Sequence, residues 1–248
     1  MRLFTNGDSF TFGHGMMRPE NTTGQWDHLN DQQYDMANAW PARLGALLGW
    51  DVTNLAIVGG SNERIVRTTI DHITKTHTRP DLVIIGWSYL LRREIHTIDH
   101  PTDQLQSWPD DRWRRLNASY HGLFDMPEGN ESVEQSMRYG WDDIESMVRY
   151  FNNVLLLRAW LRRQGLPYLF LNSYDTPRQR LSHYGFTRNA YATVQVTGLA
   201  RMMDWTEFAD LDGITDAWGL AMTNDPELRV DEIPVSYTHL TLPTIYSV

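Results

Sequence analysis

The sequence predicts an α/β fold in which a parallel sheet lies between layers of helices. Short apolar runs alternate along the chain with segments of helical periodicity. Runs without internal polar alternation are typical of strands covered on both faces, and their alternation with helices favours right-handed parallel crossovers. With 248 residues, of which 41% are hydrophobic, the chain can bury one substantial core. We therefore expect a single domain over residues 1–234.

The expected elements follow in order along the chain. The strands are "RLFTN" (2–6), "VTNLAIV" (52–58), "DLVIIGW" (81–87) and "PYLFLNSY" (167–174). The helices cover residues 38–50, 61–75 and 144–165, where apolar residues recur at helical spacing. Pro41 near the first turn of one helix and Gly165 at the end of another mark helix boundaries. Residues 14–36 and 96–140 are weakly periodic and predict long loops over the sheet, with short surface helices as the alternative for the second.

Polar or glycine residues follow three of the predicted strands. Ser9 lies in "NGDSFTFG", Gly59 in "NLAIVGGSNERI", and Ser88 ends "VIIGWS". In parallel sheets ligands bind beyond the carboxyl ends of the strands, so these residues would meet at one edge. Each block also has an ordinary explanation, since such residues turn chains and cap helices.

Taken together, the three blocks resemble the SGNH, or GDSL-type, serine hydrolases. The resemblance implies a flavodoxin-like three-layer sandwich and hydrolysis of a short acyl or acetyl ester through an acyl-enzyme, with no metal or cofactor. By position it makes Ser9 the nucleophile and an oxyanion donor through its own amide, and Gly59 the second amide donor. The family's third donor is an asparagine side chain, but this chain has Trp87 and Ser88 there. Ser88, or Asn62 from the neighbouring loop, is the candidate replacement.

The catalytic base is not evident from the sequence. The family carries it in a late Asp-x-x-His block, yet none of the nine histidines has an aspartate three residues before it. His183, after the fourth predicted strand, is the best resident candidate. His14 is close to Ser9 in sequence, but in a turn-to-helix segment we expect it to point elsewhere.

The last residues offer an explanation for the missing block. "VSYTHLTLPTIYSV", residues 235–248, resembles translated sequencing-adaptor read-through of the kind found in metagenomic protein predictions. We expect this tail to be non-native, the protein to have continued past Pro234, and the displayed chain to have little or no esterase activity. The alternative is a genuine C-terminal strand, because the tail is rich in strand-forming residues.

Composition limits the other classes of function. Lys plus Arg number 22 and Asp plus Glu 31, a net charge of −9, which argues against nucleic acid as a partner. The absence of cysteine excludes disulfides and a cysteine nucleophile. Without a visible signal peptide or transmembrane run, we expect a cytoplasmic protein that does not bind membranes.

Two readings of the function stay open at this point. The first is an esterase or carbohydrate deacetylase, and the second is a non-catalytic module of the same fold that recognises a glycan. Aromatic residues of the two long segments would suit stacking on a sugar as well as ordinary packing. These residues are Trp26, Trp108, Trp113 and Tyr120.

Overall fold

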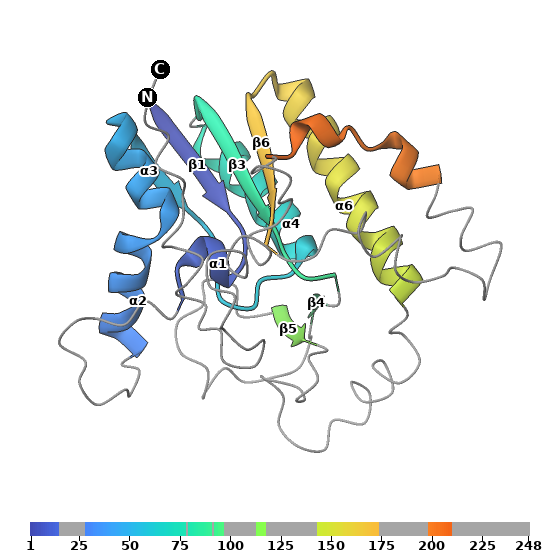
Figure 1. The fold of residues 1–248 in the computed structure, drawn as a ribbon, viewed down its shortest axis with the longest axis horizontal. Coiled ribbons are helices and arrows are strands. Elements are labelled where there is room, and N and C mark those ends of the chain that lie inside the picture. Colours follow the sequence, from blue (N-terminus) through green and yellow to red (C-terminus); the bar gives the residue numbers. More distant parts are fainter. Residues whose placement is uncertain are drawn as a thin grey trace, which may run out of the picture.

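The central feature of the fold is a parallel sheet. A computed structural model describes residues 1–14, 28–77, 79–90, 92–96, 113–117, 143–173 and 198–209. Within them the strands β1 (Arg2–Asn6), β2 (Asp51–Asn54), β3 (Leu82–Trp87) and β6 (Tyr168–Asn172) form a sheet of order β2-β1-β3-β6, and each pairing is parallel (Figure 1). The predicted α/β class and the four predicted strands are confirmed, although β2 ends at Asn54, four residues before the predicted end at residue 58.

Helices cover both faces of this sheet, and strand register shows which helix covers which face. The side chain of Asn6 in β1 donates hydrogen bonds to helix α4 (Asn62–Thr76). The face of β1 that carries the even-numbered residues therefore meets that helix. Leu3, which points to the opposite face, is in register with Val52 of β2. Val52 in turn packs against Gly45 of helix α3 (Trp40–Leu48), where an added Cβ would lie 2.1 Å from a Val52 methyl carbon.

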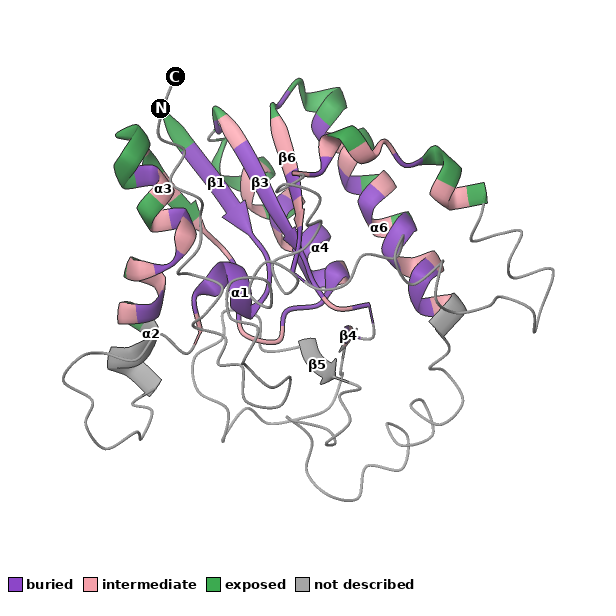
Figure 2. Ribbon diagram, viewed as in Figure 1, coloured by how far each residue is buried: buried purple, intermediate pink, exposed green. Residues whose placement is uncertain are grey.

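The larger part of the core lies between the sheet and two helices on the α4 face. Helix α6 (Asp143–Gln164) contacts α4 there and buries apolar residues from almost every turn (Figure 2). Alternate residues of β3 point into this layer and meet the aromatic rings of α6 and β6. The most buried members are Val83, Ile85, Trp87, Tyr150, Phe151, Val154, Leu157, Leu161 and Phe170.

The helix boundaries have local causes that the sequence makes visible. Ser61 caps α4 by accepting a hydrogen bond from the Arg64 amide at 3.2 Å. Pro41 stands in the first turn of α3, and Gly49 ends that helix in the left-handed conformation at φ 65°. Gly165 closes α6 at φ 62°. The three predicted helices are confirmed, and their first and last residues lie within two positions of the predicted ones.

The predicted loops contain more structure than their sequences indicate. Helix α2 (His28–Asn38) occupies part of the first, so that part of the loop prediction is wrong. In the second, β5 (Trp113–Asn117) pairs antiparallel with β4 (Arg92–His96), which leads into that segment. Beyond β6, a 3₁₀ turn at Trp205–Glu207 leads to a parallel bridge between Phe170 and Phe208. Residues 235–248 and the prediction made for them lie outside the described residues.

Candidate active site

Ser9 lies at the carboxyl edge of the sheet, directly after β1. The chain leaves β1 at Asn6, turns through Gly7 and Asp8, and enters the short helix α1 (Ser9–Phe12). Asp8 caps α1 because its side chain accepts a hydrogen bond from the Phe10 amide at 3.1 Å. Ser9 is therefore the first residue of a helix whose start is fixed by the residue before it.

Close backbone contacts bring the ends of β1 and β3 against this helix. A Cβ added to Gly7 would lie 2.3 Å from the Thr11 hydroxyl oxygen and 3.0 Å from the Gly86 carbonyl oxygen. A Cβ added to Gly86 would lie 2.3 Å from the same hydroxyl oxygen. At Gly7 the added atom would also lie 2.7 Å from the Thr11 Cβ, whereas at Gly86 the Thr11 hydroxyl alone is too close. The glycine that interrupts "IIGW" is thus required by packing next to Ser9.

The segment after β2 runs alongside the same turn. Ile57 donates its amide to the Gly7 carbonyl at 3.3 Å, and a Cβ added to Gly60 would lie 3.0 Å from that carbonyl oxygen. Gly59 adopts a left-handed φ of 72°, which glycine tolerates without strain. The structure thus brings the glycine pair next to the Gly7–Ser9 turn.

A fully buried carboxylate stands immediately before Ser9. One oxygen of Asp8 accepts from the Phe10 amide and, at 2.9 Å, from the Ser173 hydroxyl after β6. The other accepts from the Ser88 hydroxyl at 3.1 Å and from Arg92 Nη1 at 2.8 Å. Because these groups all donate, the arrangement fits the ionised carboxylate. Asp8 therefore connects α1 to residues that follow β3 and β6.

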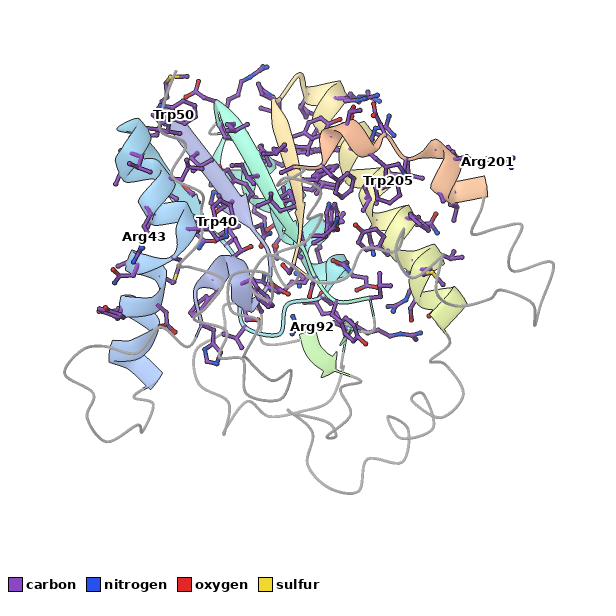
Figure 3. All side chains as sticks on the ribbon, viewed as in Figure 1. Trp40, Arg43, Trp50, Arg92, Arg201 and Trp205 are labelled. Atoms are coloured by element: carbon purple, nitrogen blue, oxygen red, sulfur yellow. The ribbon has the colours of Figure 1, made fainter. Side chains whose placement is uncertain are left out.

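The electrostatics of Asp8 are balanced between burial and these donors. Burial raises the pKa of the Asp8 carboxyl above its ordinary value, while the charge of Arg92 and the hydrogen bonds from Ser173, Phe10 and Ser88 oppose the rise. Arg92 is itself only 8% exposed. The pair is thus an ion pair shielded from solvent, at the edge where Figure 3 shows Arg92.

Ser88 and Asn62, the two candidate third donors, are bonded to each other. The Ser88 amide donates to Asn62 Oδ1 at 2.8 Å, and Asn62 Nδ2 donates to the Ser88 carbonyl at 3.1 Å. The single hydroxyl proton of Ser88 goes to Asp8, and Arg92 Nη1 donates to the Ser88 oxygen at 2.9 Å. Within the described part of the chain, the hydrogen bonds of Asn62 use one of its two N–H groups.

The other candidates are placed differently. The Trp87 ring, 1% exposed, lies in the core between Tyr150 and Phe170. His183 lies outside the described residues. Among the described residues, no three His, Asp or Glu side chains form a group that could hold a metal ion, and no helix is long and apolar enough to cross a membrane.

Two features near Ser9 were not found from the sequence. Arg92 belongs to the run "LLRRE", and its only signal was its distance of four residues from Ser88. The second is a pairing of His14 with Asp35 of α2, whose Nδ1 and Oδ2 atoms are 3.8 Å apart. Asp35 is fully buried, although it lies in a segment that reads as a polar loop.

The fold and this edge define an α/β protein with a buried charged cluster next to a strand-end serine. The chain belongs to DUF6071, a family of unknown function whose model matches residues 24–224. No curated protein matches it.

Several solved structures are similar to the chain at low identity. TesA is 15% identical with a TM-score of 0.45, covering 96% of this chain and 92% of TesA. The acetyl xylan esterase AlAXEase is 12% identical with a TM-score of 0.41, covering 92% and 84%. A protein assigned to the lipolytic G-D-S-L family, from Desulfitobacterium hafniense DCB-2, is 13% identical with a TM-score of 0.36, covering 81% and 68%. The activity of each is a property of that protein. The fold of the present chain is established by the chain's own strand order and layers.

Proposed function

We propose that this chain is an SGNH-type serine hydrolase that cleaves short acyl or acetyl esters, with Ser9 as the nucleophile. The observation that carries the proposal is the convergence at Ser9. Gly7 and Gly86 allow α1 to lie against the ends of β1 and β3, and the Gly59–Gly60 turn contacts Gly7 from the other side. A nucleophile of this kind needs amide donors close by, a role that we propose for the amides of Ser9 and Gly59.

The proposed reaction proceeds through an acyl-enzyme. The Ser9 hydroxyl oxygen attacks the ester carbonyl carbon, and the carbonyl electron pair becomes an oxyanion. The amides of Ser9 and Gly59 donate to that oxyanion. The intermediate then collapses as the C–O bond to the alcohol breaks, and the proton that left Ser9 goes to the departing alcohol. Water then attacks the acyl-enzyme, the acid is released, and Ser9 recovers a proton from that water.

Asn62 is the better third donor of the two candidates. Ser88 would have to release Asp8 before its hydroxyl proton could face an oxyanion. Asn62 keeps one N–H after bonding the Ser88 carbonyl, so it can donate without breaking an existing contact. We therefore propose Asn62 for this role. Loss of such a donor lowers kcat by about 10²–10³-fold in a serine protease, which sets the expected scale for Asn62→Ala.

The substrate class is proposed at two levels. A short acyl or acetyl ester is the general level. Attachment of the ester to a carbohydrate is the finer level. It is supported by the aromatic residues of the two long segments, which would suit stacking on a sugar. The side chains of Trp26, Trp108, Trp113 and Tyr120 lie outside the described residues.

Active-site labelling tests the proposal directly. The proposal departs here from the expectation of little or no esterase activity drawn from the missing late block. A fluorophosphonate probe should add one label to the 248-residue chain, at Ser9 by peptide mass, and the same chain should release p-nitrophenol from p-nitrophenyl acetate. Ser9→Ala should lose both signals. Thr76→Ala, at an exposed hydroxyl in the last turn of α4, away from the carboxyl edge of the sheet, is the control and should keep them. A folded chain that neither labels nor turns over the ester would instead be a non-catalytic module, as the alternative reading holds.

A further inference from the structure

We infer that His14, oriented by Asp35, is the base that takes the proton from Ser9. The inference rests on the proposed function and adds the residue that the sequence did not supply. It places the base in the turn that follows α1.

The turn after α1 brings His14 back to Ser9. Gly13 ends the helix in the left-handed conformation at φ 91°, and its amide donates to the Ser9 carbonyl at 2.9 Å. The His14 amide donates to the same carbonyl at 3.0 Å. This is the six-to-one hydrogen bond of a Schellman turn, in which the residue after the glycine returns beside the residue five positions before it, often with an apolar side-chain contact. Residues 9 and 14 are the pair that this turn brings together.

Gly13 cannot easily be replaced in this turn. Its φ is unfavourable for other residues, and an added Cβ would lie 2.6 Å from the Asp35 carbonyl oxygen of α2. The close approach of α2 is also what positions the Asp35 side chain. Helix α2 and the α1 turn therefore form one packed unit that holds His14 and Asp35 together.

The orientation of the pair matches the chemistry of a histidine base. Asp35 Oδ2 lies 3.8 Å from His14 Nδ1, within ion-pair distance once the ring is protonated. The Asp35 side chain is fully buried, whereas the His14 side chain is 29% exposed. A buried carboxylate on Nδ1 stabilises the imidazolium that forms when Nε2 accepts a proton.

His14 carries one proton through each half of the reaction. As the Ser9 oxygen forms its bond to the ester carbon, its proton moves to His14 Nε2 and the carbonyl pair moves to oxygen. When the C–O bond to the alcohol breaks, the alcohol oxygen takes that proton from Nε2. Water repeats the sequence on the acyl-enzyme, with its proton passing to His14 and then to Ser9.

Chemical rescue tests this role and separates it from folding. We expect His14→Ala to lower kcat for p-nitrophenyl acetate by about 10²–10⁴-fold, the usual contribution of a general base, and added imidazole to restore part of the rate. Asp35→Asn should reduce kcat by more than tenfold. His77→Asn, at an exposed helix end with a φ of 50° that asparagine accepts, is the matched control and should retain the wild-type rate. His14→Gln serves if the alanine variant does not fold.

Each other outcome has a definite reading. Labelling of Ser9 at the wild-type rate in a folded His14→Ala chain would overturn the inference and leave the proposed function intact. Loss of labelling in His183→Asn with normal labelling in His14→Ala would do the same and assign the base to His183. No labelling of the wild-type chain would overturn both.

Discussion

The buried ion pair between Asp8 and Arg92 leads to a quantitative prediction for stability. Arg92→Met keeps much of the side-chain volume but removes the charge that faces Asp8 at 2.8 Å. Removing one partner of a buried pair costs about 3–5 kcal/mol. Since donors from Phe10, Ser88 and Ser173 remain on the carboxylate, we expect the lower end, about 3 kcal/mol. For a chain of this length that corresponds to a fall in Tm of about 6–12 °C.

Replacing the other partner, Asp8, should lower the free energy of unfolding by a similar amount, for a different reason. In Asp8→Asn the amide group has one acceptor oxygen, and its NH₂ would face groups that themselves donate, either Ser173 or the Arg92 side. Replacing both partners removes the mismatch. The double variant Asp8→Asn/Arg92→Met should therefore be more stable than the sum of the single losses predicts, by about 2 kcal/mol.

Urea unfolding of the four chains measures this coupling. Lys75→Ala provides the control, because Lys75 pairs with Asp71 at the same 2.8 Å but both side chains are more than half exposed. That pair should contribute less than about 0.5 kcal/mol. The reasoning fails if Arg92→Met is as mild as Lys75→Ala, or if the two single losses add within about 0.5 kcal/mol.

Two further predictions concern the same edge. The charge of Arg92 lowers the pKa of the buried Asp8, so Arg92→Met should raise that pKa further. The stability lost by the variant should be smallest in acid, where Asp8 is protonated in both chains. The loss should grow as the pH rises from the wild-type pKa to the variant pKa. A pH series of urea midpoints checks it, and a loss that grows toward acid would contradict it. Gly86→Ala should cost about 1–3 kcal/mol because its Cβ would lie 2.3 Å from the Thr11 hydroxyl oxygen. Thr11→Ala in the same chain should recover most of that loss in thermal unfolding, since the Thr11 Cβ is at 3.7 Å, and an unrelieved loss would place the strain elsewhere.

The elements that could be predicted share a local cause. Strands β3 and β6 lie in continuous apolar runs, and each predicted helix has a periodic face with a cap or a terminal glycine in its own sequence. Helix α2 has neither signal: it is polar along most of its length, and its fully buried residue at position 35 is an aspartate. A helix that buries a carboxylate reads as a surface loop unless its partner is known.

The residues of the candidate site also fall into those that local sequence predicts and those that depend on distant contacts. Ser9 and Gly59 could be proposed because each follows a strand, and the edge of a parallel sheet is set by strand order. Arg92 could not, because its contact with Asp8 joins residues 84 positions apart, across a turn whose path the sequence does not specify. His14 was close in sequence, but only the left-handed Gly13 and the approach of α2 show where it turns.

Strand β4 connects this charged cluster to the helices behind the sheet. Successive residues of a strand point to opposite sides, and here Arg92 reaches the cluster while its neighbour Arg93 pairs with Glu145 of α6. The next residue, Glu94, is paired at 3.0 Å with Arg67 of α4. The Arg93–Glu145 pair is the more exposed of the two, so salt should weaken it first. Because the buried contact of Arg92 is screened least, β4 should stay attached at the serine edge even when its outer pair is lost. The strand is thus anchored most firmly where it meets the residue before Ser9.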